Sequence, residues 1–125
     1  MIRRFLRDTD GATAVEFGLT APVFFALMFG LIDGGMLLWT QLGLQHATEM
    51  AARCASVNKT LCAETTAVKS YASTQALGLA MAPSVFTVAQ VSCGSQVTAR
   101  YDFGFVAGYY GTPVMTLNAT ACFPK

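Results

Sequence analysis

A long uncharged stretch near the N-terminus constrains this sequence more than any other feature. Between Glu16 and Glu49 the ionisable side chains are Asp33 and His46 alone. Residues 17–32 read FGLTAPVFFALMFGLI and carry no charge, and the apolar run resumes after Asp33. The apolar fraction of the whole chain is 54% and the charged fraction is 12%, roughly half the usual share. The chain therefore divides into a charged tip, a lipid-like segment and a mixed remainder.

The length of the uncharged stretch predicts one membrane crossing. A bilayer core takes about 20 helical residues, so we expect a helix that crosses from about Phe17 to Leu38. Trp39 then falls at the headgroup level, where amphipathic aromatic rings are enriched. Three arginines precede the stretch and no basic cluster follows it closely: Arg3, Arg4 and Arg7. The positive-inside rule therefore places the N-terminus in the cytoplasm and the rest of the chain outside.

A secretory signal peptide is the alternative interpretation of the same N-terminus. Two features count against it. The apolar run is longer than an ordinary signal-peptide core and continues into an amphipathic helix. Three acids also lie within what would be the basic leader: Asp8, Asp10 and Glu16.

Two carboxylates border or interrupt the apolar run. A carboxylate near the lipid core costs about 2.5 to 3.5 kcal/mol on insertion scales, so each needs a physical reason. For Asp33 we weigh interfacial snorkelling or local hydration against helix packing or contact with a partner. Glu16 lies at the predicted cytoplasmic edge, and its neighbours suggest a more specific role.

The residues around Glu16 resemble a type IV prepilin cleavage signal. Gly11 is followed by Ala12 and, five residues after the glycine, by Glu16 and Phe17. The resemblance implies that a membrane peptidase cuts after Gly11, where a glycine lets the backbone enter the enzyme in extended form. The Glu16 carboxylate would then neutralise a new N-terminal amine in lipid, where an unpaired charge is costly.

A broader segment, Gly11 to Arg53, resembles the N-terminal signature of TadE-like minor pilins of bacterial tight-adherence (Tad) pilus systems. The shared features are a basic leader, G-x-x-x-V-E-F, a proline in the apolar run, an acid after it and an alanine-rich amphipathic tail. Two departures are Asp33, where the family more often has Glu, and the absence of a basic residue after Gly34-Gly35. The resemblance covers about a third of the chain.

The resemblance implies a minor pilin or pseudopilin used in pilus assembly, adhesion and biofilm formation. The expected partners are other pilin subunits, prepilin peptidase, inner-membrane pilus assembly proteins and membrane lipid. The expected location is the bacterial inner membrane, with a periplasmic C-terminal domain and incorporation into a surface pilus. The alternative is an unprocessed inner-membrane accessory protein of the same assembly machinery.

Three segments follow from this reading: a leader at 1–11, a transmembrane and projecting helix at 12–57, and a small exported domain at 58–125. We expect Pro22 to bend the helix. Beyond the membrane an apolar stripe of small residues runs along it, including Leu44, Ala47 and Ala51. The stripe fits packing against the domain's own strands, and the alternative is contact with a neighbouring subunit.

The expected fold is α+β and pilin-like, with the long helix packed on an antiparallel sheet of three to four strands. Thr65 or Thr66 could cap a second helix that reaches about Leu79. Val97, Ala99, Tyr101 and Phe103 alternate with polar residues in the clearest strand. Val85–Ser92 and Val114–Cys122 supply its neighbours, with a turn at 93–95 between the first two strands. Gly104–Pro113 reads as a loop, either packed or a contact surface.

All four cysteines lie downstream of the apolar stretch: Cys54, Cys62, Cys93 and Cys122. An even number on the exported side indicates disulfides. Three pairings are open, and we prefer Cys54–Cys62 with Cys93–Cys122 because each joins neighbours in the expected architecture.

Several function classes find no support in the sequence. From Gly11 onward the acids and bases balance, so we expect no nucleic-acid partner. We expect no metal, because one histidine and no C-x-x-C pair supply no zinc spacing. No nucleophile motif or phosphate-binding glycine loop is present. We therefore expect no enzymatic activity, no cofactor and no small-molecule substrate.

Overall fold

One helix dominates the backbone. The computed structural model describes residues 11–106 and 114–124. Helix α2 (Ala12–Val57) holds 46 residues and is about 70 Å long at about 1.5 Å per residue. It is followed by helix α3 (Thr65–Thr74), a short 3-10 turn η2 (Pro83–Val85) and strands β1 (Phe86–Val91), β2 (Gly94–Phe103) and β3 (Met115–Phe123). The predicted α+β class is confirmed, with three strands in the described part of the chain.

Two expectations concern residues outside the described part. The predicted basic leader lies there, apart from Gly11, and so does most of the predicted glycine and aromatic loop, at residues 107–113.

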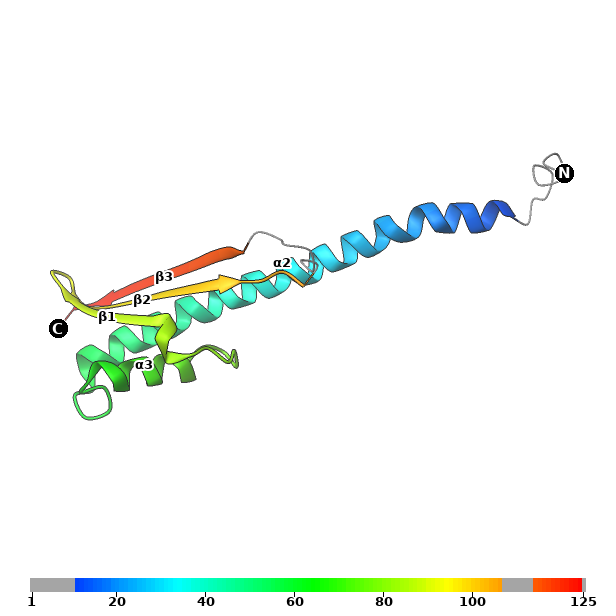
Figure 1. Cartoon of the computed structure of the whole chain (residues 1–125). Helices are drawn as coiled ribbons and strands as arrows, with labels where there is room; N and C mark the ends of the chain where they lie inside the picture. Colours follow the sequence, from blue (N-terminus) through cyan, green and yellow to red (C-terminus); the bar gives the residue numbers. More distant parts are fainter. Residues whose placement is uncertain (1–10, 107–113, 125) are drawn as a thin grey trace.

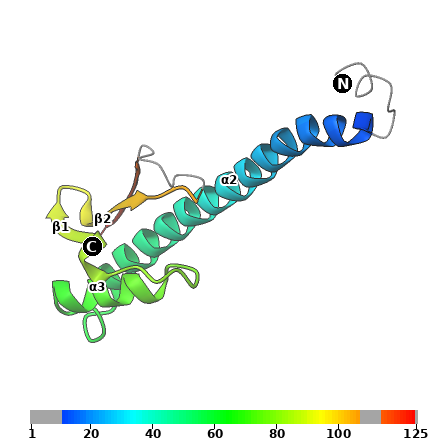
Figure 2. The ribbon, with the colours of Figure 1, turned by 45° about the vertical axis from the view of Figure 1, so that its right-hand side comes forward.

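Helix α2 passes through Pro22 without interruption. Proline has no N–H to donate to the carbonyl four residues earlier, and its ring crowds that carbonyl. The axis of the helix turns in its blue N-terminal part in both views (Figure 1, Figure 2). The bend expected from proline is therefore present, while the helical run continues.

The two halves of α2 have different surroundings. The most apolar stretch of the helix, near its N-terminal end, is 0% buried by the described residues. The C-terminal half instead runs along the sheet and beside α3, so that the helices form one layer and the strands the other (Figure 1). The N-terminal half extends alone beyond this small domain (Figure 2).

The sheet is antiparallel with the order β1-β2-β3. Val97 on the central strand lies opposite Val88 on β1 and Ala121 on β3. Alternate β2 residues are buried against the helices, as the predicted alternation requires: Val97, Ala99 and Phe103. The same period holds on β3, where Leu117 and Ala119 are buried.

The core lies between the sheet and the helices. Its helical side is built mainly of small residues, which let the backbones approach closely: Ala47, Ala51, Ala52, Ala55, Ala72 and Ala76. Phe86, Leu44 and Val97 are the largest apolar side chains that are almost fully buried. Because small side chains dominate, this core buries little apolar area per residue, and cross-links have more to contribute.

Two disulfides close the chain on itself. Cys54 at the end of α2 is bonded to Cys62, and Cys93 in the β1–β2 turn is bonded to Cys122 near the end of β3. This is the pairing preferred from the sequence. Each bond of this kind contributes about 2 to 4 kcal/mol by restricting the unfolded chain.

The second helix is shorter than predicted. It ends at Thr74 rather than near Leu79, because Leu77 and Gly78 both have positive φ angles, 51° and 80°. Neither Thr65 nor Thr66 is its N-cap. Glu64 takes that position without a side-chain hydrogen bond.

The turn between β1 and β2 comes earlier than predicted. It consists of Ser92 and Cys93, and β2 begins at Gly94. Gly94 has a φ of 128°, and an added Cβ would collide with the carbonyl oxygen of Phe123. A glycine is required at that place, so the turn is fixed one or two residues before the predicted position.

Candidate membrane segment and processing site

The predicted cleavage residues lie at the N-terminal end of α2. Gly11 is the N-cap, with φ −84° and ψ −18°, and no side chain caps the helix there. Ala12 is the first helical residue. Glu16 and Phe17 are exposed one turn later, and Phe17 is 72% exposed. Among the described residues no helix or strand covers these two side chains, so they are accessible to another protein.

The fold of this chain does not itself require a glycine at position 11. Its backbone angles are open to any residue, and a Cβ added there would meet no atom within 4 Å. A Cβ added at Gly30, farther along the helix, would also meet no atom within 4 Å. The presence of a glycine at position 11 therefore has no explanation within the described fold.

The apolar side chains that follow project from α2 on all sides. They include Val15, Leu19, Val23, Phe24, Leu27, Phe29 and Leu31, each at least 45% exposed. A soluble core helix would bury such a row, whereas a lipid-facing helix exposes it to the bilayer. Within the described residues, α2 is the one helix long and apolar enough to cross a membrane. It fits a single-pass membrane protein.

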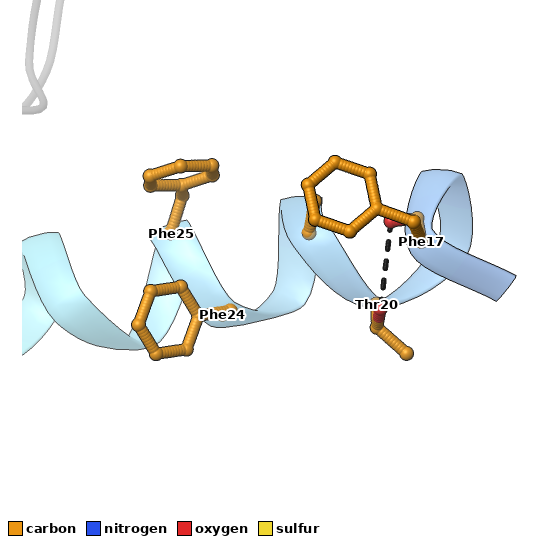
Figure 3. A pocket seen from close by; sticks show the side chains of 5 residues that line it. Phe17, Thr20, Phe24 and Phe25 are labelled. Atoms are coloured by element: carbon orange, nitrogen blue, oxygen red, sulfur yellow. Dashed lines mark hydrogen bonds between the residues drawn. The ribbon is translucent and has the colours of Figure 1, made fainter. Parts of the chain in front are cut away.

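An open recess of about 350 Å³ lies on this exposed surface, beside the proline bend. Its lining is Phe17, Thr20, Ala21, Phe24 and Phe25, and Figure 3 shows the aromatic rings spread along the helix. The Thr20 hydroxyl donates to the backbone carbonyls of Glu16, at 2.9 Å, and Phe17, at 3.4 Å. The recess therefore offers an apolar surface for a lipid chain or another helix.

Asp33 marks the place where the helix enters the folded domain. It is 5% exposed, and its Oδ1 accepts a hydrogen bond of 3.0 Å from the backbone N–H of Val106, just after β2. Burial of a carboxylate is tolerated when hydrogen bonds satisfy it. Of the two alternatives weighed for Asp33, this burial and hydrogen bond favour packing within its own chain over snorkelling or local hydration.

The predicted stripe of small residues lies in the core of the chain. Leu44, Ala47 and Ala51 are each 0% exposed. One turn away, Gly43 is so close to the segment after α3 that an added Cβ would lie 2.7 Å from Leu79 Cδ1 and 3.1 Å from the carbonyl oxygen of Ala76. A larger residue at Gly43 would push the two segments apart.

Three polar side chains of α2 bind the domain through backbone carbonyls. Gln41 Nε2 donates to Asn118 O at 3.0 Å, and Ser56 Oγ donates to Phe123 O at 3.1 Å. His46 Nδ1 lies 3.0 Å from Gln75 O at the end of α3, so that nitrogen must carry the proton. These contacts could not be predicted from the sequence, because a backbone carbonyl acceptor corresponds to no recognisable sequence pattern.

Among the described residues no group of three or more His, Cys, Asp or Glu side chains could hold a metal ion. In the same residues, all four cysteines are joined in disulfides. The described structure is therefore a long helix with an exposed apolar N-terminal half and a C-terminal half that packs on a small disulfide-linked domain.

Comparison with known proteins identifies the segment that carries these features. The family model described as "TadE-like protein" matches residues 11–53. Comparisons with curated proteins and with solved structures gave no match. The matched segment covers 43 of the 125 residues, from the N-cap of α2 to its last turn. The resemblance drawn from the sequence is thus confirmed: residues 11–53 are similar to TadE-like proteins, which is consistent with a TadE-like protein of Tad pilus systems.

Proposed function

We propose that this chain is a minor pilin or pseudopilin of a Tad-type pilus, used in pilus assembly, adhesion and biofilm formation. The single observation that carries the proposal is the N-terminal end of α2. There a glycine that the described fold does not require precedes Glu16 and Phe17, both exposed, on the apolar half of α2, whose most apolar stretch is 0% buried among the described residues. These features, in a TadE-like segment, fit a substrate of prepilin peptidase. The chain itself performs no catalysis in this role.

The membrane segment in this proposal is shorter than the sequence alone suggested. The domain begins at Asp33, so the stretch free to contact lipid on all sides ends at Ile32. From Thr13 to Ile32 there are 20 residues, which span about 30 Å and match the hydrocarbon core of a bilayer. Glu16 then lies near the cytoplasmic edge, beside the arginines of the leader, and the sheet domain lies in the periplasm.

Cleavage after Gly11 would create an N-terminal amine with which the Glu16 carboxylate can pair. The new amine of Ala12 and the Glu16 carboxylate are four residues apart, which on a helix places them on one face. A carboxylate at this position can pair with the amine of its own chain or of a neighbouring subunit during assembly. The partners in this proposal are other pilin subunits, prepilin peptidase, inner-membrane assembly proteins and lipid.

The processing step is tested by substitution of the glycine. In cells with an active prepilin peptidase, Gly11→Leu should remain at full length in the membrane, because a side chain obstructs the extended backbone in the peptidase. Gly30→Leu is the matched control, since that glycine also has open space around it and lies far from the cut. It should be cleaved like the native protein. Mass spectrometry of the N-terminus gives the result.

Glu16→Ala separates cleavage from assembly. It should be cut after Gly11 but enter pili poorly, because an unpaired buried charge costs about 3 to 5 kcal/mol. If native protein from these cells still begins at Met1, the pilin proposal is wrong. The unprocessed inner-membrane accessory protein then becomes the better explanation.

A further inference from the structure

The end of the domain that faces the apolar half of α2 has an unusual composition. Two connections reach this end, residues 75–82 after α3 and residues 104–106 after β2, and neither contains an ionisable side chain. The carboxylate of Asp33 is also there, but it is buried and accepts the hydrogen bond from Val106. Among the described residues, the other charged side chains of the domain lie on α2 beyond Gln45, in the 58–64 turn, on α3 and on the exposed face of β2. Of these, Asp102 lies nearest to the 104–106 connection, and its carboxylate accepts a hydrogen bond from the Thr116 hydroxyl on β3.

Apolar side chains are exposed at this end. Met36, Trp39 and Leu79 contribute to an open recess of about 260 Å³ between α2 and the segment after α3. Met36 and Trp39 are 48% and 52% exposed. Val106, on the side of α2 next to the sheet, is 60% exposed. These side chains surround α2 just above the stretch assigned to the bilayer.

Leu77 adds an independent observation. Its φ angle is 51°, in the left-handed region that leucine rarely adopts, and its side chain is 37% exposed. The fold thus holds a large apolar side chain on a strained backbone and leaves it partly in the open. Backbone strain of this kind clusters at functional sites.

The face of α2 that points away from the domain shows where the apolar surface ends and the polar surface begins. Leu38 and Leu42 on this face are 68% and 52% exposed, whereas Gln45 and Glu49, the next residues on the same face, are polar. The apolar surface therefore continues about ten residues past Ile32, or about 15 Å at 1.5 Å per residue. One headgroup layer is roughly 5 to 8 Å thick, so this apolar surface extends through the whole layer, and the domain end, which begins directly after Ile32, starts within it.

We infer that the end of the domain formed by Met36, Trp39, Leu77, Leu79 and Val106 is a lipid-contact surface. It rests on the headgroup region of the bilayer that α2 crosses, and so orients the domain on the membrane before assembly. The inference rests on the membrane insertion in the proposed function. Its support is the continuity of this surface with the lipid-facing helix, the absence of exposed charge from its two connections and the strained, exposed Leu77.

The single tryptophan of the chain makes the surface measurable. In a Trp39→Phe background, one tryptophan is reintroduced by Leu77→Trp, and the full chain is reconstituted in vesicles of phosphatidylethanolamine and phosphatidylglycerol. A fraction of the lipid carries bromine atoms near the headgroup end of its acyl chains. We expect Leu77→Trp to lose most of its emission to the brominated lipid and to resist quenching by iodide in the water.

Two matched variants in the same background serve as controls. Leu61→Trp places the indole at the far end of the domain, where the native leucine is 54% exposed, and it should be quenched by iodide alone. Leu27→Trp lies in the proposed crossing, with a native exposure of 65%, and should be quenched by lipid brominated deeper in its chains. If Leu77→Trp does not fold, Val106→Trp decides by the same criterion.

Each other outcome overturns the inference. Quenching of Leu77→Trp by iodide alone, with Leu27→Trp still quenched by lipid, leaves membrane insertion intact and removes the lipid-contact surface. Protection from both quenchers indicates a second protein copy on the surface instead of lipid. Equal bromine quenching of Leu61→Trp and Leu77→Trp indicates nonspecific adhesion of the domain. Loss of lipid quenching at Leu27→Trp removes both the insertion and the surface.

Discussion

At the scale of single residues, Asp33 shows how one polar group can join a membrane helix to a folded domain. A carboxylate in an apolar helix is costly unless it is paired or hydrogen-bonded. Here the backbone N–H of Val106 donates to it at 3.0 Å. The same bond holds the chain just after β2 against α2. Asp33 thus stabilises the domain at the point where the helix leaves it.

We expect Asp33→Ala to lower the free energy of unfolding of the domain by about 1 to 3 kcal/mol, because the partly buried hydrogen bond from the Val106 N–H to the carboxylate is lost. Asp33→Asn keeps an acceptor oxygen and should lose less. Chemical unfolding in detergent, followed by near-ultraviolet circular dichroism, measures both. Glu49→Ala, on an exposed position of the same helix, is the control and should change stability by less than about 0.5 kcal/mol. A loss for Asp33→Ala no larger than that of the control would contradict this role.

The sequence indicates that the Asp33 carboxylate needs a stabilising partner in the apolar run, but it does not indicate which group provides one. The donor is a backbone N–H 73 residues away, and every residue except proline carries such a group. For the same reason the contact between Gln41 and the carbonyl of Asn118 was not predictable. By contrast, the burial of Leu44, Ala47 and Ala51 followed from their helical spacing.

At the scale of elements, long periodic segments were predictable and their ends were less so. The sequence predicts a helix from Ala12 to Val57, and α2 has these bounds. The strands agree within one or two residues, because alternation fixes a strand wherever one face is buried. The predicted end of the second helix, near Leu79, was wrong. Gly78, which has a positive φ angle, is the residue in the sequence that indicates an earlier end.

The two disulfides should differ in how readily they are reduced. Cys54 and Cys62 are 8% and 4% exposed, whereas Cys93 is exposed in the β1–β2 turn. Because exchange requires access of a thiolate to a sulfur atom, a mild reductant should open Cys93–Cys122 first in the native protein. Timed alkylation and peptide mass spectrometry should label Cys93 and Cys122 before the other pair. Simultaneous labelling of all four cysteines would indicate that reduction requires global unfolding instead.

At the scale of the whole molecule, the matched family segment and the membrane-facing surface are largely one element. Residues 11–53 match TadE-like proteins and form nearly all of α2. The sheet and α3 lie outside the match. In the proposed function, α2 would therefore carry membrane insertion and assembly, and we expect contacts with surfaces beyond the bilayer to involve the sheet layer, which lies on one side of α2 only (Figure 1).

The proposed roles of α2 and of the sheet layer depend on the orientation of the chain in the membrane. A reporter that is active only outside the cytoplasm should work when fused after Lys125 and fail when fused before Phe17. The reason is that three arginines precede the apolar helix, while the first basic residue after it is Arg53, far beyond the lipid-facing stretch. A second set of fusions in a chain with Arg3, Arg4 and Arg7 replaced by Ala is the control. It should give a mixed orientation, because the charge difference that fixes the topology is then removed. A stable C-terminal fusion of the native chain without reporter activity would place the sheet domain in the cytoplasm, where neither a periplasmic pilin domain nor its two disulfides would be expected.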